Sequence, residues 1–194
     1  IAKQNKKTIQ ANRLASALRL DGLVNAPAWN AISSGEGFRR QTLVEGGGEP
    51  TEKTEVRILY DESNLYIGVI LYDDPVGIKA FQKKWDQEIE TDDRFMWILD
   101  TFKDNRNAFY FEINPAGLHG DGLLSIGQVT RVNRDWDGIW RAWTHVGDFG
   151  WSAEIRIPFR TLSFNPKSDV WGINFQRTIR RINEELLWTG YRRN

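Results

Sequence analysis

The chain has 194 residues, of which 40% are hydrophobic and 27% charged, a composition typical of a globular domain that excludes extensive disorder. Its 26 basic and 26 acidic residues cancel, which argues against a nucleic-acid-binding protein. Cysteine is absent, which excludes disulfides and thiolate metal sites, and no apolar run is long enough to span a bilayer, so direct membrane insertion of this domain is not expected.

The amino-terminal part of the chain is polar and basic. Residues 1–17 are expected to form an extended segment, followed by a single domain over residues 18–194. Because the chain starts with Ile1, we expect a processed start that follows a removed signal peptide. Residues 18–29 predict a short strand, a turn and a helical turn that carries Trp29. The glycine-rich residues 35–53 predict a flexible loop.

Short apolar and alternating segments then follow one another at regular spacing. They predict three hairpins, which pair residues 54–60 with 65–72, 95–101 with 108–113, and 139–146 with 151–157. Another strand is expected over 170–179, and short helices over 78–86 and 158–162. The pattern predicts an all-β fold, a β-sandwich of two mostly antiparallel sheets, immunoglobulin-like or jelly-roll-like, with short helical turns.

Several stretches, taken in order and spacing, carry a family resemblance across nearly the whole chain. They are Leu20–Gly22, Ala26–Trp29, Thr54–Asp61, Leu65–Gly68, Asp92–Asp93, Leu99–Phe102, Phe111–Gly117, Trp151–Phe159 and Trp171–Arg177. Together they resemble the family-9 carbohydrate-binding modules, and more closely the amino-terminal domain of large bacterial outer-membrane proteins whose carboxy-terminal part resembles a β-barrel.

This resemblance implies a β-sandwich that is exported to the periplasm or outer membrane of a Gram-negative bacterium. It also implies a saccharide ligand clamped between aromatic rings, structural calcium, and a carboxy-terminal β-barrel of the same polypeptide as a partner. Sugar-binding members place a Trp a few residues ahead of the segment that aligns with Asp92–Asp93. This chain has Glu90 and Thr91 there, and its nearest Trp is Trp85. The clamp has therefore either moved or been lost.

Sugar rings pack on flat aromatic faces, and their hydroxyls need planar polar partners. Trp85 and Trp136 are the first candidates, because both lie among charged residues in predicted loops. Trp140 and Trp143 are three residues apart on a predicted strand and face opposite sides, so one is expected in the core; Trp140 is the third candidate. Asp93 and Arg94 are candidate ligand-binding polar residues. Three other tryptophans are expected in the core: Trp97, Trp151 and Trp171.

Two other functions and a structural calcium site remain open. A glycoside-active enzyme would need two facing carboxylates, and Glu112 and Glu154 are instead expected to pair with Arg57, Arg156 or Arg177. Calcium would suit the aspartates at 73–74, 92–93 and 135–137, although turn capping is the simpler account. A domain that docks on its own β-barrel would use the basic and aromatic stretch over residues 177–193, which otherwise is a solvated strand edge.

Overall fold

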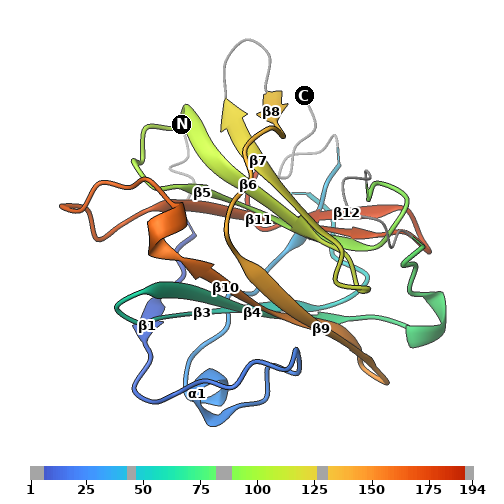
Figure 1. Cartoon of the computed structure of the whole chain (residues 1–194). Helices are drawn as coiled ribbons and strands as arrows, with labels where there is room; N and C mark the ends of the chain where they lie inside the picture. The colour runs from blue at the N-terminus through green and yellow to red at the C-terminus, as the bar shows by residue number, and fades with distance from the viewer. Residues whose placement is uncertain (1–6, 43–46, 82–88, 126–130, 191–194) are drawn as a thin grey trace.

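Two β-sheets pack face to face in the computed structural model, which describes residues 7–42, 47–81, 89–125 and 131–190 (Figure 1). Within these residues one sheet has five strands and the other seven. The five are, in spatial order, β1 (Ala11–Arg13), β3 (Thr54–Tyr60), β4 (Asn64–Tyr72), β10 (Gly150–Pro158) and β9 (Arg141–Gly147). The seven are β2 (Arg39–Arg40), β12 (Glu184–Leu187), β11 (Gly172–Ile179), β5 (Arg94–Asp100), β6 (Asn107–Ile113), β7 (His119–Ser125) and β8 (Arg131–Asn133).

This arrangement confirms the predicted sandwich. In the described residues, β1 runs parallel to β3 and all other strand pairs are antiparallel. The helical parts are the short α1 (Pro27–Asn30), η1 (Pro75–Gly77) and η2 (Phe159–Thr161). No helix in the described part of the chain is long and apolar enough to cross a membrane.

All three predicted hairpins are present, as β3–β4, β5–β6 and β9–β10. The first turn is stabilised by Asp61, whose carboxylate accepts hydrogen bonds from the backbone N–H groups of Ser63 and Asn64. The third turn ends at Gly150, which has a φ of +124°, and a Cβ there would lie 2.3 Å from the carbonyl oxygen of Leu71. Only glycine fits this position.

Some local expectations were wrong. Residues 78–81 are not helical, because the N–H groups of Lys79 and Phe81 donate to the carboxylates of Asp93 and Asp92 instead of to a helical turn. The rest of that expected helix, residues 82–88, lies outside the described residues. No strand forms over residues 18–26, and β2 lies within the expected loop at 35–53. Strands β7, β8 and β12 were missed, since they are short or interrupted by glycine.

Large side chains from both sheets fill the space between them. Trp97 on β5 stacks on Phe111 of β6, with ring centroids 5.3 Å apart, and on Phe95, at 5.7 Å. Trp151 and Ile155 of β10 are fully buried on the facing sheet. The core positions expected for Trp97 and Trp151 are therefore confirmed, while Trp171 is half-buried at the rim beside Phe164.

A second apolar cluster lies on the outer side of the five-stranded sheet, where α1 and the preceding segment cover it at the bottom of Figure 1. Its buried members are Val24, Trp29, Leu59 and Tyr66. This explains why β4 is apolar on both faces. The buried carboxylate of Glu154 accepts hydrogen bonds of 2.7 Å from the Trp29 indole and from the backbone N–H groups of Asp21 and Gly22.

Tyr66 in this second cluster makes stability sensitive to alkaline pH. Burial, together with the hydrogen bond to Asp61, raises its pKa from 10.0 to about 12. Because the folded state then holds the proton more tightly than the unfolded chain, the stabilisation is present below pH 10 and is lost as the pH rises toward 12. We expect Tyr66→Phe to unfold in urea with a shallower pH dependence between pH 9 and 11.5. Identical slopes in the two proteins would contradict this assignment.

Candidate functional site

A continuous polar network crosses the outer face of the seven-stranded sheet. Along β5, β6 and β11 the apolar residues Phe95, Phe111 and Phe175 point into the core, so the alternate residues point outward. Neighbouring strands bring these outward side chains together. The polar face, as we call it, consists of Arg94, Tyr110, Glu112, Arg134, Gln176, Thr178 and Glu185.

Glu112 organises one half of the polar face. Its side chain is 2% exposed and accepts hydrogen bonds from the Tyr110 hydroxyl, at 2.8 Å, and from Nη1 of Arg134, at 2.6 Å. Nη1 of Arg94 lies 3.5 Å from the same carboxylate. Burial, and then the nearby charge of Glu112, raise the pKa of Tyr110, so its hydroxyl stays protonated at neutral pH. The Arg134 guanidinium lies 5.5 Å from the centroid of the Tyr110 ring.

Glu185 organises the other half. Its carboxylate accepts hydrogen bonds from Thr178, at 2.8 Å, and from the Gln176 amide, at 3.0 Å. Nε of Arg94 donates to the Thr178 hydroxyl at 3.3 Å and so connects the two halves. The result is a row of planar carboxylate, guanidinium and amide groups across four adjacent strands, which can exchange hydrogen bonds with the hydroxyls of a ligand.

One position beside Glu112 carries no side chain. Gly120 on β7 lies opposite Glu112, and a Cβ there would approach the Glu112 carboxylate to 3.1 Å. The neighbouring outward positions on β5 are apolar, since Met96 and Ile98 alternate with the core residues. Polar groups beside apolar side chains on one sheet face suit a ligand that presents both hydroxyls and C–H groups.

Of the residues predicted as a site, Arg94 lies within the polar face and Asp93 does not. Asp93 is buried, and its carboxylate accepts hydrogen bonds from the backbone N–H groups of Lys79 and Arg180. Burial raises its pKa. Asp93 therefore connects two loops and offers no group to a ligand.

The predicted tryptophans do not gather at the polar face. Trp140 is 6% exposed, packs edge-on against Trp97 and Phe111, and donates from its indole to Asp121 at 2.6 Å. The structure thus corrects the expectation that Trp140 stacks on a sugar, since neither face of its ring is open. Trp136 is half-buried against Phe109, which is on the core side of the sheet opposite to Arg94. Trp85 lies outside the described residues.

The two buried glutamates considered for catalysis lie far from each other in the fold. Glu112 is on the outer face of one sheet and Glu154 on the outer face of the other, so they cannot flank a common bond. Their expected arginine partners were wrong as well. Glu112 pairs with Arg94 and Arg134, whereas Glu154 receives N–H groups of the amino-terminal segment.

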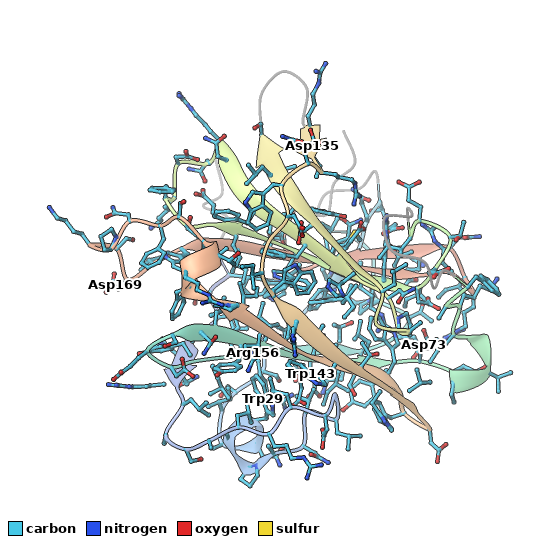
Figure 2. All side chains as sticks on the ribbon, in the orientation of Figure 1. Trp29, Asp73, Asp135, Trp143, Arg156 and Asp169 are labelled. Atoms are coloured by element: carbon cyan, nitrogen blue, oxygen red, sulfur yellow. The ribbon has the colours of Figure 1, made fainter. Side chains whose placement is uncertain are left out.

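Calcium has no evident place at the buried aspartates. Asp73 pairs with Arg177 and Arg181, and Asp92 accepts hydrogen bonds from Asn114 and from the N–H of Phe81. These donors already occupy the oxygens that a cation would need. Asp135 is exposed after β8, as Figure 2 shows. Throughout the described ranges, no three acidic or histidine side chains come together in a group able to hold a metal ion.

Sequence reasoning missed most of the polar face. The available signal was the alternation along β6 and β11, where polar residues occupy every second position: Tyr110 and Glu112, then Asn174, Gln176 and Thr178. That alternation identifies an outward face, but it does not show which strands are neighbours. The pairing of β11 with β5 is what joins Arg94 to Thr178, which is 84 residues away in the sequence.

Comparison with known proteins gives matches in structure only. No family model and no curated protein sequence matches the chain. A family-9 carbohydrate-binding module from Caldicellulosiruptor kristjanssonii, solved with cellotriose, superposes with a TM-score of 0.60 at 14% identity over 93% of this chain and 84% of that one. The same kind of module from that organism, solved with glucose, gives 0.60 at 15% identity over 94% and 85%.

A third solved structure is a candidate carbohydrate-binding protein from Bacteroides uniformis. It superposes with a TM-score of 0.62 at 12% identity, over 92% of this chain and 87% of that one. At these low identities the TM-scores show a shared fold and nothing further. The chain therefore has the sandwich of the family-9 carbohydrate-binding modules over nearly its whole length, as the sequence resemblance implied.

Proposed function

We propose that this sandwich, which has the fold of family-9 carbohydrate-binding modules, is a non-catalytic module that binds a saccharide on the polar face of its seven-stranded sheet. The observation that carries the proposal is the continuous row of Arg94, Glu112, Gln176 and Glu185, whose planar groups are connected to one another directly or through Thr178 on the outer face of the sheet. Such groups pair with the vicinal hydroxyls of a sugar ring, each of which both donates and accepts.

A non-catalytic role is supported by the same geometry. Glu112 accepts hydrogen bonds from Tyr110 and Arg134 and is approached by Arg94, so protein donors already engage both of its carboxylate oxygens. Glu185, the other carboxylate of the polar face, accepts hydrogen bonds from Thr178 and Gln176, so it too is engaged by protein donors. The module would then attach a larger protein to a saccharide.

The aromatic contribution is part of this proposal. Trp85 is the remaining stacking candidate, because Trp136 and Trp140 pack against core aromatic rings. Trp85→Ala is expected to weaken saccharide binding without lowering the midpoint of thermal unfolding. Tyr110 does not replace it, since Arg134 lies over its ring.

The test is isothermal titration of the chain with glucose, cellotriose and a panel of other neutral oligosaccharides. We expect one panel member to bind, and we expect Gln176→Ala and Arg134→Gln each to weaken its affinity by about tenfold, since each loses a hydrogen bond to the ligand. Arg106→Gln is the matched control, because Arg106 is exposed on the β5–β6 turn, away from the polar face. Thermal unfolding of each variant separates lost binding from lost folding.

Two outcomes would overturn the proposal. Binding that survives both polar-face variants would place the ligand elsewhere. No binding across the panel by a folded chain would favour the alternative, a domain that docks on a carboxy-terminal β-barrel of the same polypeptide.

Export to the periplasm or outer membrane of a Gram-negative bacterium, within a larger polypeptide, completes the proposal. It is supported by the resemblance described above and by the absence of cysteine, which makes folding independent of the redox state of the compartment. Fractionation of cells that express the full-length protein, with immunodetection of this domain, tests it. Detection in the cytoplasm alone would contradict it.

A further inference from the structure

A cluster of arginines without acidic partners lies on the opposite side of the molecule from the polar face. On the outer side of the five-stranded sheet, Arg141 of β9 is directly opposite Arg156 of β10. Arg160 follows on η2. Within the described residues, none of the three has an aspartate or glutamate within 4.0 Å. Like charges directly opposite each other on a sheet repel, so a bound anion would relieve an existing cost.

Trp143 packs beside the central arginine, Arg156. The Arg156 guanidinium lies over the Trp143 ring, 5.6 Å from its centroid, and Figure 2 shows the two side chains together on β10 and β9. A cation–π contact of this kind uses no N–H donor of the guanidinium. No acceptor in the described residues receives a hydrogen bond from Arg156. Its N–H donors are therefore available for a planar anion.

An open hollow of about 490 Å³ adjoins this arginine. Its lining comes from the β3–β4 turn and from the end of β10: Glu62, Ser63, Asn64, Arg156, Pro158, Phe159 and Arg160. Two arginines line the hollow against one glutamate, and Glu62 is already paired with Arg13 at 3.0 Å. The nearby carboxylate of Asp61 is occupied by Ser63, Asn64 and Tyr66. The remaining positive charge is local, because the chain as a whole has no net charge.

We propose that this hollow is a second binding site, selective for a sugar unit that carries a carboxylate, such as a uronic acid of an acidic oligosaccharide. The inference rests on the proposed saccharide-binding function. Arg156 binds the carboxylate in a bidentate manner, Arg141 and Arg160 flank it, and the ring of Phe159 and the hydroxyl of Ser63 face the sugar. A single carboxylate matches a short cluster of three arginines better than a long polyanion does, because a polyanion would need an extended basic surface.

The experiment compares three trisaccharides by isothermal titration of the whole chain at 50 mM salt: trigalacturonate, its fully methyl-esterified form, and cellotriose. Triglucuronate and trimannuronate extend the acidic set. We expect at least one acidic trisaccharide to bind about tenfold or more tightly than trigalacturonate methyl ester, and to lose most of this advantage at 500 mM salt. Arg156→Gln is expected to abolish the advantage, and Arg156→Lys to restore only part of it, since lysine lacks the fork.

Two further variants separate the second site from the first. Arg160→Gln, at an exposed position, is expected to weaken acidic binding several-fold with no change in the midpoint of thermal unfolding, and Arg106→Gln is the matched control. Gln176→Ala should leave unchanged the ratio between the affinities for the acidic trisaccharide and for the methyl ester. If acid and ester bind equally, or if Gln176→Ala rather than Arg156→Gln removes the advantage, the second site is wrong. If cellotriose or another neutral sugar binds and no acidic trisaccharide binds more tightly than the methyl ester, only this inference fails. If nothing binds, the proposed function fails with it.

Discussion

Replacing Glu154 with alanine is expected to lower the free energy of unfolding by roughly 3 kcal/mol or more. The carboxylate is buried and accepts three N–H groups, from Asp21, Gly22 and Trp29, each at 2.7 Å. Its loss leaves those donors without an acceptor, and an unsatisfied buried donor costs about 1–3 kcal/mol. Urea denaturation followed by tryptophan fluorescence measures the loss.

The effect should concentrate in the amino-terminal segment. Glu154 accepts three hydrogen bonds that fix α1 and the residues before it on the five-stranded sheet, beside a fourth from the Ser152 hydroxyl to the carbonyl oxygen of Gly22. Glu154→Ala should therefore also make residues 14–32 more sensitive to a protease under native conditions. The stability of Glu154→Gln is expected to lie between that of the unsubstituted protein and that of Glu154→Ala, because its amide oxygen still accepts a hydrogen bond while its NH₂ group faces another donor. Glu62→Ala is the control, since this exposed glutamate pairs only with Arg13 at the surface. Equal losses at both positions would contradict the assignment.

Replacing Arg177 with alanine is the second large expected effect, a loss of about 3–5 kcal/mol. Arg177 lies on β11 of the seven-stranded sheet, is 1% exposed, and reaches across the sandwich to the other sheet. It donates to Thr54, to the carbonyl oxygens of Lys53 and Tyr72, and to the carboxylate of Asp73. Burial lowers its pKa, to about 10, but the group stays charged at neutral pH. Its removal would leave several buried acceptors unpaired in one step.

Partial replacements distinguish charge from hydrogen bonding at this position. Arg177→Lys keeps the charge and loses the fork, so we expect it to recover less than half of the loss, whereas Arg177→Met fills the space and satisfies no acceptor. Asp73 keeps Arg181 as a partner, since Nε of Arg181 lies 2.6 Å from its carboxylate. The loss of stability in Arg177→Ala is therefore expected not to exceed about 5 kcal/mol. Chemical denaturation at pH 7, with Arg106→Ala as the exposed control, gives the comparison. A loss below 1 kcal/mol for Arg177→Ala would contradict a bridging role.

Arg177 also shows where sequence reasoning failed. In the sequence it belongs to a basic stretch that was interpreted as a solvated strand edge, and in the structure it lies inside the sandwich. Trp188, from the same stretch, is 2% exposed and donates to the carbonyl oxygen of Glu36. Alternation along β11 already puts Arg177 on the inner face with Phe175 and Ile179, and it was the charge of the stretch that suggested a solvated edge. Arg192 and Arg193 lie outside the described residues.

The sequence by itself determined the class of fold and the three hairpins, because period-two alternation and turn residues are local and act within a few positions of each other. It also determined the core positions of Trp97 and Trp151, which follow from that alternation. Only the tertiary structure decided which outward residues meet. Arg94 joins Thr178 and Glu112, and Arg141 faces Arg156, through strand neighbours and registers set by the packing of the whole sandwich. Trp140 follows the same rule. The strand period left open whether Trp140 or Trp143 faces the core, and the aromatic core beside Phe111 decided that Trp140 is the buried one.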